Sequence, residues 1–226
     1  MWPRPHPTNN GMKVAIHWRG SREHRILRWA SQVLLLIGCL ALAFCALAYL
    51  DAELYQIYAN WGFHDLPSIG EVTRTTTRPG LRAFAREGSP LSRLEIPRVM
   101  VSVVVSEGIK PLTLSRAAGH IPGTVFPDEL GNVGIAGHRD TLFRRLGEVK
   151  TGDVITLTTP SRFYQYSVEW TRVVLPSHVE VLEPSNTAVL TLVTCYPFTY
   201  LGPAPRRFVV RARLMRSTLR HQPATI

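Results

Sequence analysis

The chain has 226 residues, of which 45% are hydrophobic, and its formal net charge is +10. This length accommodates one ordinary domain with additional segments, and it excludes two large domains. The charge indicates either anionic surroundings or a solvated basic surface. Because the sequence carries no RNP, zinc-finger or helix-turn-helix signature, nucleic acid is not an expected partner.

The N-terminal part contains a polar, basic tail (residues 1–25) followed by a long apolar segment. The stretch from Val33 to Leu50 has no charged residue, which makes it long enough for a transmembrane helix if residues 26–29 extend it. A cleaved signal peptide is the alternative, but its apolar core usually spans only about 7–15 residues. The length therefore favours an uncleaved transmembrane signal-anchor helix over residues 26–50.

The charges that flank this apolar segment indicate its orientation. Basic residues precede it: Lys13, Arg19, Arg22, Arg25 and Arg28. Acidic residues, Asp51 and Glu53, follow it directly. Since the positive side of a span stays in the cytoplasm, we expect a single-pass protein of the cytoplasmic membrane, with its N-terminus inside and its remaining domain extracytoplasmic.

The three cysteines fall into two groups. Cys39 and Cys45 lie within the apolar segment, without a metal-binding or redox spacing, and we interpret them as small apolar side chains in lipid. Cys195 is then the only thiol of the exported part. Exported proteins commonly pair their cysteines, so a lone thiol there is either reactive or awaits a partner chain.

Residues 51–65 have apolar side chains at helical spacing and predict an amphipathic juxtamembrane helix, which a linker rich in Pro and Gly extends to residue 90. From residue 91 the pattern changes to short β-rich runs, which indicate one mostly β domain over residues 91–216, followed by a tail at 217–226. The expected strands are Leu94–Ile96, Met100–Val105, Asn132–Ala136, Asp153–Thr158, Phe163–Val174, Ala188–Thr194 and Phe208–Leu214. Two short helices are expected, at Leu112–Gly119 and Thr141–Val149. Many close strands with few helices favour a closed barrel or a sandwich.

Cys195 ends the β-rich run AVLTLVTC and is followed by Tyr196-Pro197. Proline cannot donate to a sheet ladder, so the strand ends there and the thiol lies next to a loop, where catalytic groups are often placed. A buried structural cysteine is the alternative. At neutral pH a thiol is only a few per cent thiolate, so a nucleophilic Cys195 needs a base or a cation beside it.

Histidines supply the candidate bases. His138 follows a short apolar strand with a glycine-rich exit, in GNVGIAGHRD, and His120 in RAAGHIPGT is the rival. Asp140 has two possible roles: it orients the imidazole of His138, or it caps the helix expected at Thr141–Val149, which its position favours.

The candidate for oxyanion stabilisation is the pair Arg206-Arg207 at the start of RFVVRARL. In an alternating strand, Phe208 and every second residue after it face the core, so Arg207 faces outward. Arginine keeps its proton and can hold a carbonyl or a developing oxyanion. A solvated basic strand edge is the alternative.

Taken together, these segments resemble the sortase family. TLVTC (Thr191–Cys195) is similar to the signature around the sortase nucleophile, GNVGIAGHRDTLF to the histidine segment, and APRRFVV to the strand of the essential arginine. The similarity runs from about Leu94 to Leu214 in family order, and TLVTCYPF with the following Gly-Pro-Ala-Pro stretch is most similar to class D sortases.

The resemblance implies a sortase-type eight-stranded β-barrel, with a few short helices, in which Cys195, His138 and Arg207 meet at one end. Its substrates would be proteins with a C-terminal LPxTG-like sorting signal, joined through a thioester on Cys195 to an amine of a cell-wall precursor or a pilin. Thr194, Arg206 and His120 would support substrate binding. Some sortases use calcium, but no acidic cluster around Glu148, Asp153 or Glu180 is suited to it, so we expect no metal and no cofactor.

Two other functions remain open. A membrane-tethered cysteine peptidase would use the same residues and give the acyl group to water. A non-catalytic barrel would only bind sorting motifs or cell-wall polymer, and would not need the thiol of Cys195.

Overall fold

The computed structural model describes residues 21–65, 85–200 and 202–220, with side chains except at 21–23 and 58–65. The chain divides into two compact units, Met1–Leu47 and Ala48–Ile226. Most of the predicted tail at 1–25, most of the linker at 66–90, and the last residues of the chain lie outside the described residues.

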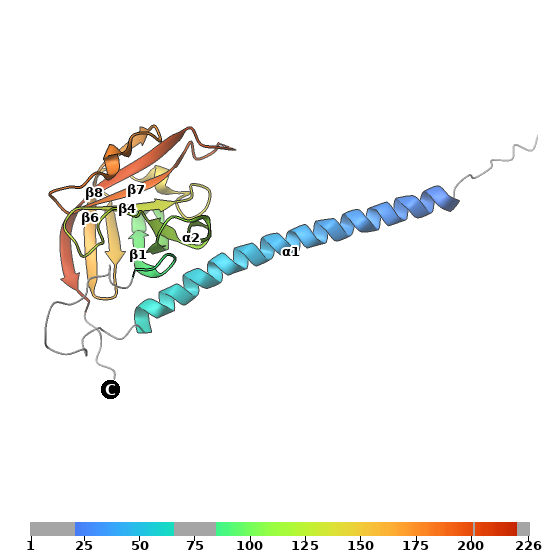
Figure 1. The fold of residues 1–226 in the computed structure, drawn as a ribbon, viewed down its shortest axis with the longest axis horizontal. Helices are drawn as coiled ribbons and strands as arrows, with labels where there is room; N and C mark the ends of the chain where they lie inside the picture. Colours follow the sequence, from blue (N-terminus) through green and yellow to red (C-terminus); the bar gives the residue numbers. More distant parts are fainter. Residues whose placement is uncertain (1–20, 66–84, 201, 221–226) are drawn as a thin grey trace, which may run out of the picture. The chain divides into compact units, whose positions relative to one another are not determined.

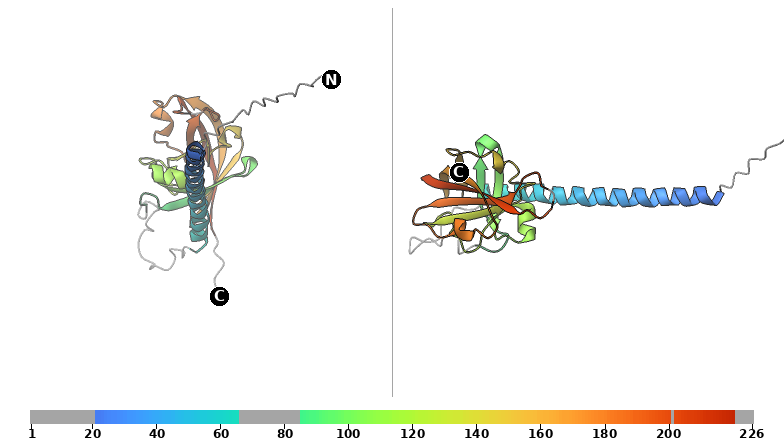
Figure 2. Two further views of the ribbon diagram at one scale, coloured as in Figure 1. Left: turned by 90° about the vertical axis from the view of Figure 1, so that its right-hand side faces the viewer. Right: turned by 90° about the horizontal axis from the view of Figure 1, so that it is seen from above.

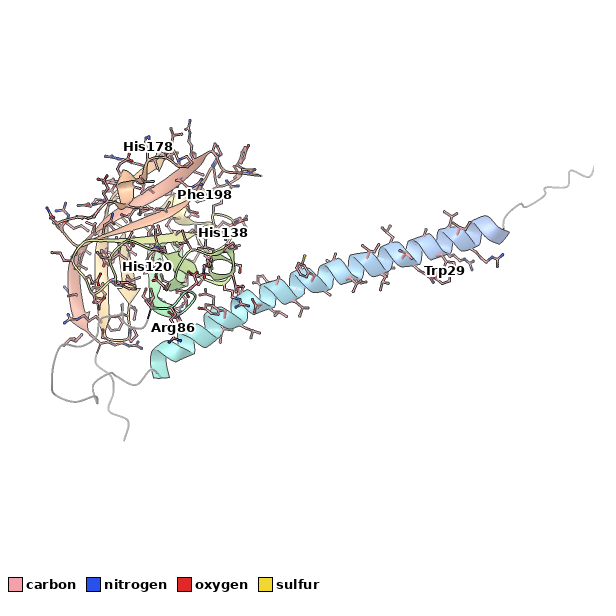
Figure 3. The ribbon with its side chains drawn as sticks, in the orientation of Figure 1. Trp29, Arg86, His120, His138, His178 and Phe198 are labelled. Carbon is pink, nitrogen blue, oxygen red and sulfur yellow. The ribbon has the colours of Figure 1, made fainter. Side chains whose placement is uncertain are left out.

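The described part of the first unit is helical and belongs to α1 (Ser21–Asp65). Within α1, His24–Ile57 is long and apolar enough to cross a membrane, with a mean hydropathy of 2.7, and it includes the span expected at 26–50. The side chains of this part project outward, and Trp29 is 70% exposed (Figure 3). One apolar helix therefore precedes the β domain, as predicted.

The second unit contains a closed barrel of eight strands in the order β1-β2-β3-β4-β7-β8-β6-β5 (Figures 1 and 2). Its strands are β1 (Pro90–Ile96), β2 (Val101–Glu107), β3 (Ala118–His120), β4 (Asn132–Gly137), β5 (Val154–Thr158), β6 (Arg162–Val174), β7 (Val189–Tyr196) and β8 (Arg206–Leu219). The predicted mostly β fold with eight strands is confirmed. β8 extends into the segment that we predicted to be a tail from residue 217.

The helices of this unit are short. They are α2 (Pro111–Arg116), η2 (Pro97–Val99), η3 (Leu146–Glu148) and η4 (Val179–Leu182). Both α2 and η2 begin with proline, whose missing N–H costs nothing in the first turn.

The predicted helix over Leu112–Gly119 is wrong at its C-terminal end, where β3 begins. β3 pairs with β2 on one side and with β4 on the other, so tertiary strand pairing overrides the local helical spacing. The predicted helix over Thr141–Val149 is also wrong, because turns lead there into the single 3₁₀ turn η3. Asp140 does not cap this helix: the N-cap of η3 is Arg145, without a side-chain cap bond.

Strand alternation fills the barrel interior. In β5, Ile155 and Leu157 are fully buried while Val154 is 40% exposed. In β8, Phe208, Val210 and Ala212 belong to the main core cluster. Arg207 is therefore on the outer face of the barrel, as the sequence pattern predicted.

The last described turns of α1 belong to the second unit and cover the outer face of β2. Tyr55 packs against the fully buried Val104, and its hydroxyl lies 2.8 Å from Ser106 Oγ. Gln56 Oε1 accepts the Val104 N–H at 2.9 Å, and Gln56 Nε2 donates to the Arg116 carbonyl. A glutamine side chain thus satisfies a backbone donor that the short strand β3 leaves unpaired.

Candidate active site

The candidate site lies where three neighbouring strands, β4, β7 and β8, meet at one rim of the barrel (Figure 1). β7 and β8 are antiparallel, with Cys195 directly opposite Arg207. β4 and β7 are parallel, with Gly137 paired to Thr194. Continued by one residue, this register puts His138, the first residue after β4, beside Cys195.

Alternation assigns these residues to faces. Leu190 and Leu192 of β7 belong to the interior core, so Thr194 has their orientation and Cys195 the opposite one. Cys195 and Arg207 are thus on the outer face, where opposed side chains have Cβ atoms about 4.5–5.5 Å apart. Continuing the alternation of β4 by one residue past Gly137 gives His138 the same orientation. The fold brings the predicted thiol, imidazole and guanidinium into one row.

Cys195 is a free, half-buried cysteine, whereas Cys39 and Cys45 are exposed on α1. His138 is exposed, and Figure 3 shows it on the same side of the domain as Phe198. An accessible imidazole beside an accessible thiol can exchange a proton with it and with a bound substrate.

Arg207 is held in place by its own loop. Its Nη1 donates to the carbonyl oxygens of Arg206 at 3.0 Å and Ala204 at 3.2 Å. These bonds orient the planar guanidinium and use only one of its nitrogen atoms. Arg206 is exposed and pairs with Tyr196 instead of Cys195. The register therefore distinguishes the two arginines and favours Arg207 as the one beside the thiol.

Thr194 connects the strands of the predicted nucleophile and base. Its side chain is only 2% exposed, and its Oγ1 donates to the Gly137 carbonyl at 2.7 Å. The bond joins β7 to β4 one residue before both Cys195 and His138. The predicted contact of Thr194 with substrate stays a prediction, and this placement favours a role in positioning the strands.

His120 lies in β3 with 2% exposure, and both of its ring nitrogens have partners. Nδ1 lies 2.7 Å from Glu107 Oε2. Nε2 lies 3.0 Å from the Val125 carbonyl and 3.1 Å from Thr124 Oγ1. The role of His120 in substrate binding stays a prediction, and its buried hydrogen-bond network favours a structural contribution.

Asp140 is exposed and has no hydrogen bond to His138 within the described part of the chain. It lines a hollow of about 460 Å³ together with Arg139 and Arg144 on one side and Phe198, Thr199, Tyr200 and Gly202 on the other. The predicted orienting role of this carboxylate is therefore without a contact in the structure.

The sequence pattern does not indicate Arg139, yet this residue hydrogen-bonds the loop after Cys195 at three backbone positions. Its guanidinium donates to the carbonyl oxygens of Pro197, Tyr200 and Gly202. The sequence feature that could have indicated Arg139 is its position directly after His138. Its partners are backbone atoms, which the identity of the residues does not reveal.

The acidic residues considered for calcium are engaged elsewhere. Glu148 pairs with Arg145, Asp153 with Arg98, and Glu180 with His178. In the ranges that the structure describes, no group of three or more His, Cys, Asp or Glu side chains is arranged to hold a metal ion.

The closed eight-stranded barrel, with a thiol, an imidazole and a guanidinium in one row, defines the class of protein with which this chain is compared. The sortase domain family model matches residues 94–215. Sortase D of Bacillus subtilis is 35% identical over 118 residues, which cover 52% of this chain and 60% of that protein. Sortase A of Listeria monocytogenes is 29% identical over 138 residues, which cover 58% of this chain and 60% of that protein.

Solved structures agree with the fold. A Clostridium perfringens sortase D5 transpeptidase superposes with a TM-score of 0.58 at 24% identity, covering 73% of this chain and 98% of that one. Listeria monocytogenes sortase A gives 0.54 at 27% identity, covering 59% and 92%. Sortase E1 from Streptomyces coelicolor, solved with a tripeptide in its active site, gives 0.53 at 28% identity, covering 60% and 93%.

Because the family model covers more than half of the chain, this protein belongs to the sortase family. The aligned part spans 60% of the length of the two curated relatives. The residues that the family model matches, 94–215, include Cys195, His138 and Arg207.

Proposed function

We propose that this protein is a membrane-anchored cysteine transpeptidase that cleaves an LPxTG-like sorting signal and transfers the acyl part to an amine. The observation that carries the proposal is the register of β7 and β8, which pairs Cys195 with Arg207 next to the exit of β4. Nucleophilic catalysis by a thiol needs a proton carrier and an oxyanion donor within reach, and this row supplies both.

In the first half-reaction, the Cys195 thiolate attacks the carbonyl carbon of the Thr–Gly or Thr–Ala bond of the signal. A C–S bond forms, and the carbonyl oxygen becomes an oxyanion toward which Arg207 donates hydrogen bonds. The C–N bond then breaks as the protonated His138 gives its proton to the leaving amine. The product is a thioester on Cys195.

In the second half-reaction, an amine of a cell-wall precursor or a pilin attacks the thioester carbonyl. Neutral His138 accepts the proton of this amine, and the C–S bond breaks to release the thiolate. The sum of both steps is exchange of one amide bond for another, with His138 and Cys195 returned to their starting states.

Arginine suits its role because it stays protonated at any pH at which a protein functions. Its charge favours both the thiolate and the oxyanion over their neutral forms. Hydrogen bonds from Arg207 Nη1 to the carbonyl oxygens of Arg206 and Ala204 hold the guanidinium in place before substrate binds. Little rotamer entropy is therefore lost in the transition state.

The membrane assignment rests on α1 and on the charges around it. His24–Ile57 has the length and hydropathy of a span, and basic residues precede its apolar core while Asp51 and Glu53 follow it. The positive-inside rule then directs the barrel to the outer side of the cytoplasmic membrane, where sorting signals emerge during export.

The proposal is tested with the full-length chain in detergent, an LPxTG-type peptide, and a glycine peptide as the amine. Mass spectrometry should detect the new amide in addition to cleavage, and Cys195→Ala should abolish both products. Cleavage to the free acid alone, at saturating amine, would identify a peptidase. An unaltered biological effect of Cys195→Ala would identify a barrel that only binds the signal.

A further inference from the structure

Arg139 directly follows the predicted base, His138, and its guanidinium hydrogen-bonds the loop after Cys195. This loop follows Cys195 and precedes Arg207, joining β7 to β8. Arg139 Nη1 donates to the Pro197 carbonyl at 3.0 Å. Its Nη2 donates to the backbone carbonyls of Tyr200 at 2.6 Å and Gly202 at 2.9 Å. The guanidinium also lies 5.8 Å from the centroid of the Tyr200 ring.

A second contact joins the same two segments. The ring of Phe198 packs so closely on Gly147 that a Cβ atom there would lie 2.6 Å from it. Phe198 also contacts Phe208 of β8, with ring centroids 5.4 Å apart. The connection after β4 therefore holds the β7–β8 loop by a polar contact at Arg139 and an apolar one at Gly147.

A second polar cross-link lies on the other side of Cys195 and His138. Thr194 Oγ1 donates to the Gly137 carbonyl, one residue before Cys195 and His138 respectively. Arg139 bonds the Pro197 carbonyl beyond both residues. His138 and Cys195 are thus bracketed by two cross-links between the same two segments.

We propose that Arg139 is a positioning residue, which sets the distance between Cys195, His138 and Arg207 by fixing the β7–β8 loop. This inference rests on the transpeptidase function proposed above. Only arginine presents several donors in one rigid plane, and three carbonyls at separate positions along the loop match that fork. A lysine ammonium, as a compact point donor, cannot span the same set.

The expected signature is a loss of turnover more than of substrate affinity. Small displacements of catalytic groups cost up to about 100-fold in rate, because the reacting atoms leave their near-attack geometry. We therefore expect Arg139→Gln to lower kcat by about 10- to 100-fold, with a small change in KM. Arg139→Lys should rescue only part of this loss. Arg145→Gln is the control, because it removes an equal charge from the same β4–β5 connection, and the Arg145 guanidinium bonds Glu148 instead of the loop. It should keep kcat within about twofold.

The loop contact is measured independently of activity by hydrogen exchange on the full-length chain in detergent. Peptides that cover Tyr196 to Gly202 should exchange faster in Arg139→Gln than in the wild type, while those from β5 and β6 should not. Tyr200→Ala removes the ring from the guanidinium at an exposed position. It should lower kcat by about threefold alone, and less than that when added to Arg139→Gln.

These outcomes separate the two proposals. A wild type without transpeptidation and faster loop exchange in Arg139→Gln would overturn the function and keep the contact. Normal kcat in a folded Arg139→Gln, or unchanged loop exchange, would overturn the positioning role. Should Arg139→Gln fail to fold, unaltered kcat in Tyr200→Ala would overturn it as well.

Discussion

Cys195 and Arg207 are direct cross-strand partners on β7 and β8, although they are separated in the chain by the loop that Arg139 holds. Antiparallel pairing gives both side chains the same face of the barrel. The relationship also excludes the neighbouring arginine from this position, because Arg206 is opposite Tyr196.

Arg207→Ala should therefore lower kcat/KM by about 100- to 1,000-fold, the usual cost of losing one oxyanion donor. Arg206→Ala removes an equal charge from the adjacent residue and should stay within about threefold, since an exposed charge contributes little. Steady-state cleavage of a sorting-signal peptide measures both. The reverse ranking would shift the role to Arg206.

His138→Ala should lower kcat by about 100- to 10,000-fold, because neither the leaving amine nor the attacking amine then has a proton carrier. His120→Ala should instead destabilise the fold. It leaves Glu107 and the Val125 carbonyl without their ring partner, which costs about 1–3 kcal/mol for a buried group. Activity below the melting transition, compared with thermal unfolding, distinguishes the two histidines. An active His138→Ala together with a stable, inactive His120→Ala would exchange their roles.

Thr194→Val keeps the shape of the side chain and removes the hydrogen bond to the Gly137 carbonyl. We expect a loss of about 1–3 kcal/mol in the free energy of unfolding, and a lower kcat with a similar KM. Thr194→Ser, which keeps the hydroxyl, is the matched control. A selective rise in KM for Thr194→Val would show that Thr194 contacts substrate, as its position in the signature motif suggested.

Gln56→Ala should destabilise the barrel by about 1–3 kcal/mol, since the buried Val104 N–H loses its acceptor. The control is Glu53→Ala on the same helix, an exposed residue that should change unfolding by less than about 0.5 kcal/mol. Chemical unfolding of the full chain in detergent measures both. Equal stabilities would mean that the end of α1 does not contribute to the fold of the domain.

Asp153 gives a pH-dependent prediction. The hydrogen bonds from Arg98 lower the pKa of this carboxyl below its ordinary value, with a smaller contribution from the Lys150 N–H. The unfolded state therefore binds more protons in acid, and the pair stabilises the fold above about pH 4, the unfolded pKa. This contribution is lost as the pH falls through the folded pKa.

Asp153→Asn should accordingly lower stability by about 1 kcal/mol at neutral pH, since Arg98 is 45% exposed and solvent screens the pair. The difference from the wild type should vanish in acid below the folded pKa. Urea unfolding across pH 2–7 measures it, at intervals of about one pH unit. A difference that stays constant with pH would exclude the ion pair as its source.

Much of the fold could be predicted because strand alternation is a local property of the sequence. Phe208, Val210 and Ala212 face the core as expected, and the strand of Cys195 ends at Tyr196, directly before Pro197. Ala118 and Gly119 belong to a predicted helix by local spacing, and their pairing with β2 and β4 places them in a strand.

The candidate site also has residues that the sequence indicates and contacts that it does not. Cys195, His138 and Arg207 carry side-chain chemistry at strand ends, so their residue types indicate them. Arg139 acts on carbonyl oxygens of a loop, and Thr194 donates to the carbonyl of Gly137. Backbone acceptors are the same for every residue type, so neither contact is encoded in a recognisable pattern.

The most direct test of the account is the intact mass of the full-length protein after mixing with a sorting-signal peptide and no amine. We predict a thioester adduct that peptide mapping assigns to Cys195, that a glycine peptide discharges, and that accumulates less in His138→Ala and Arg207→Ala. Cleavage of the peptide with no adduct on Cys195, or with full activity in Cys195→Ala, would contradict the account.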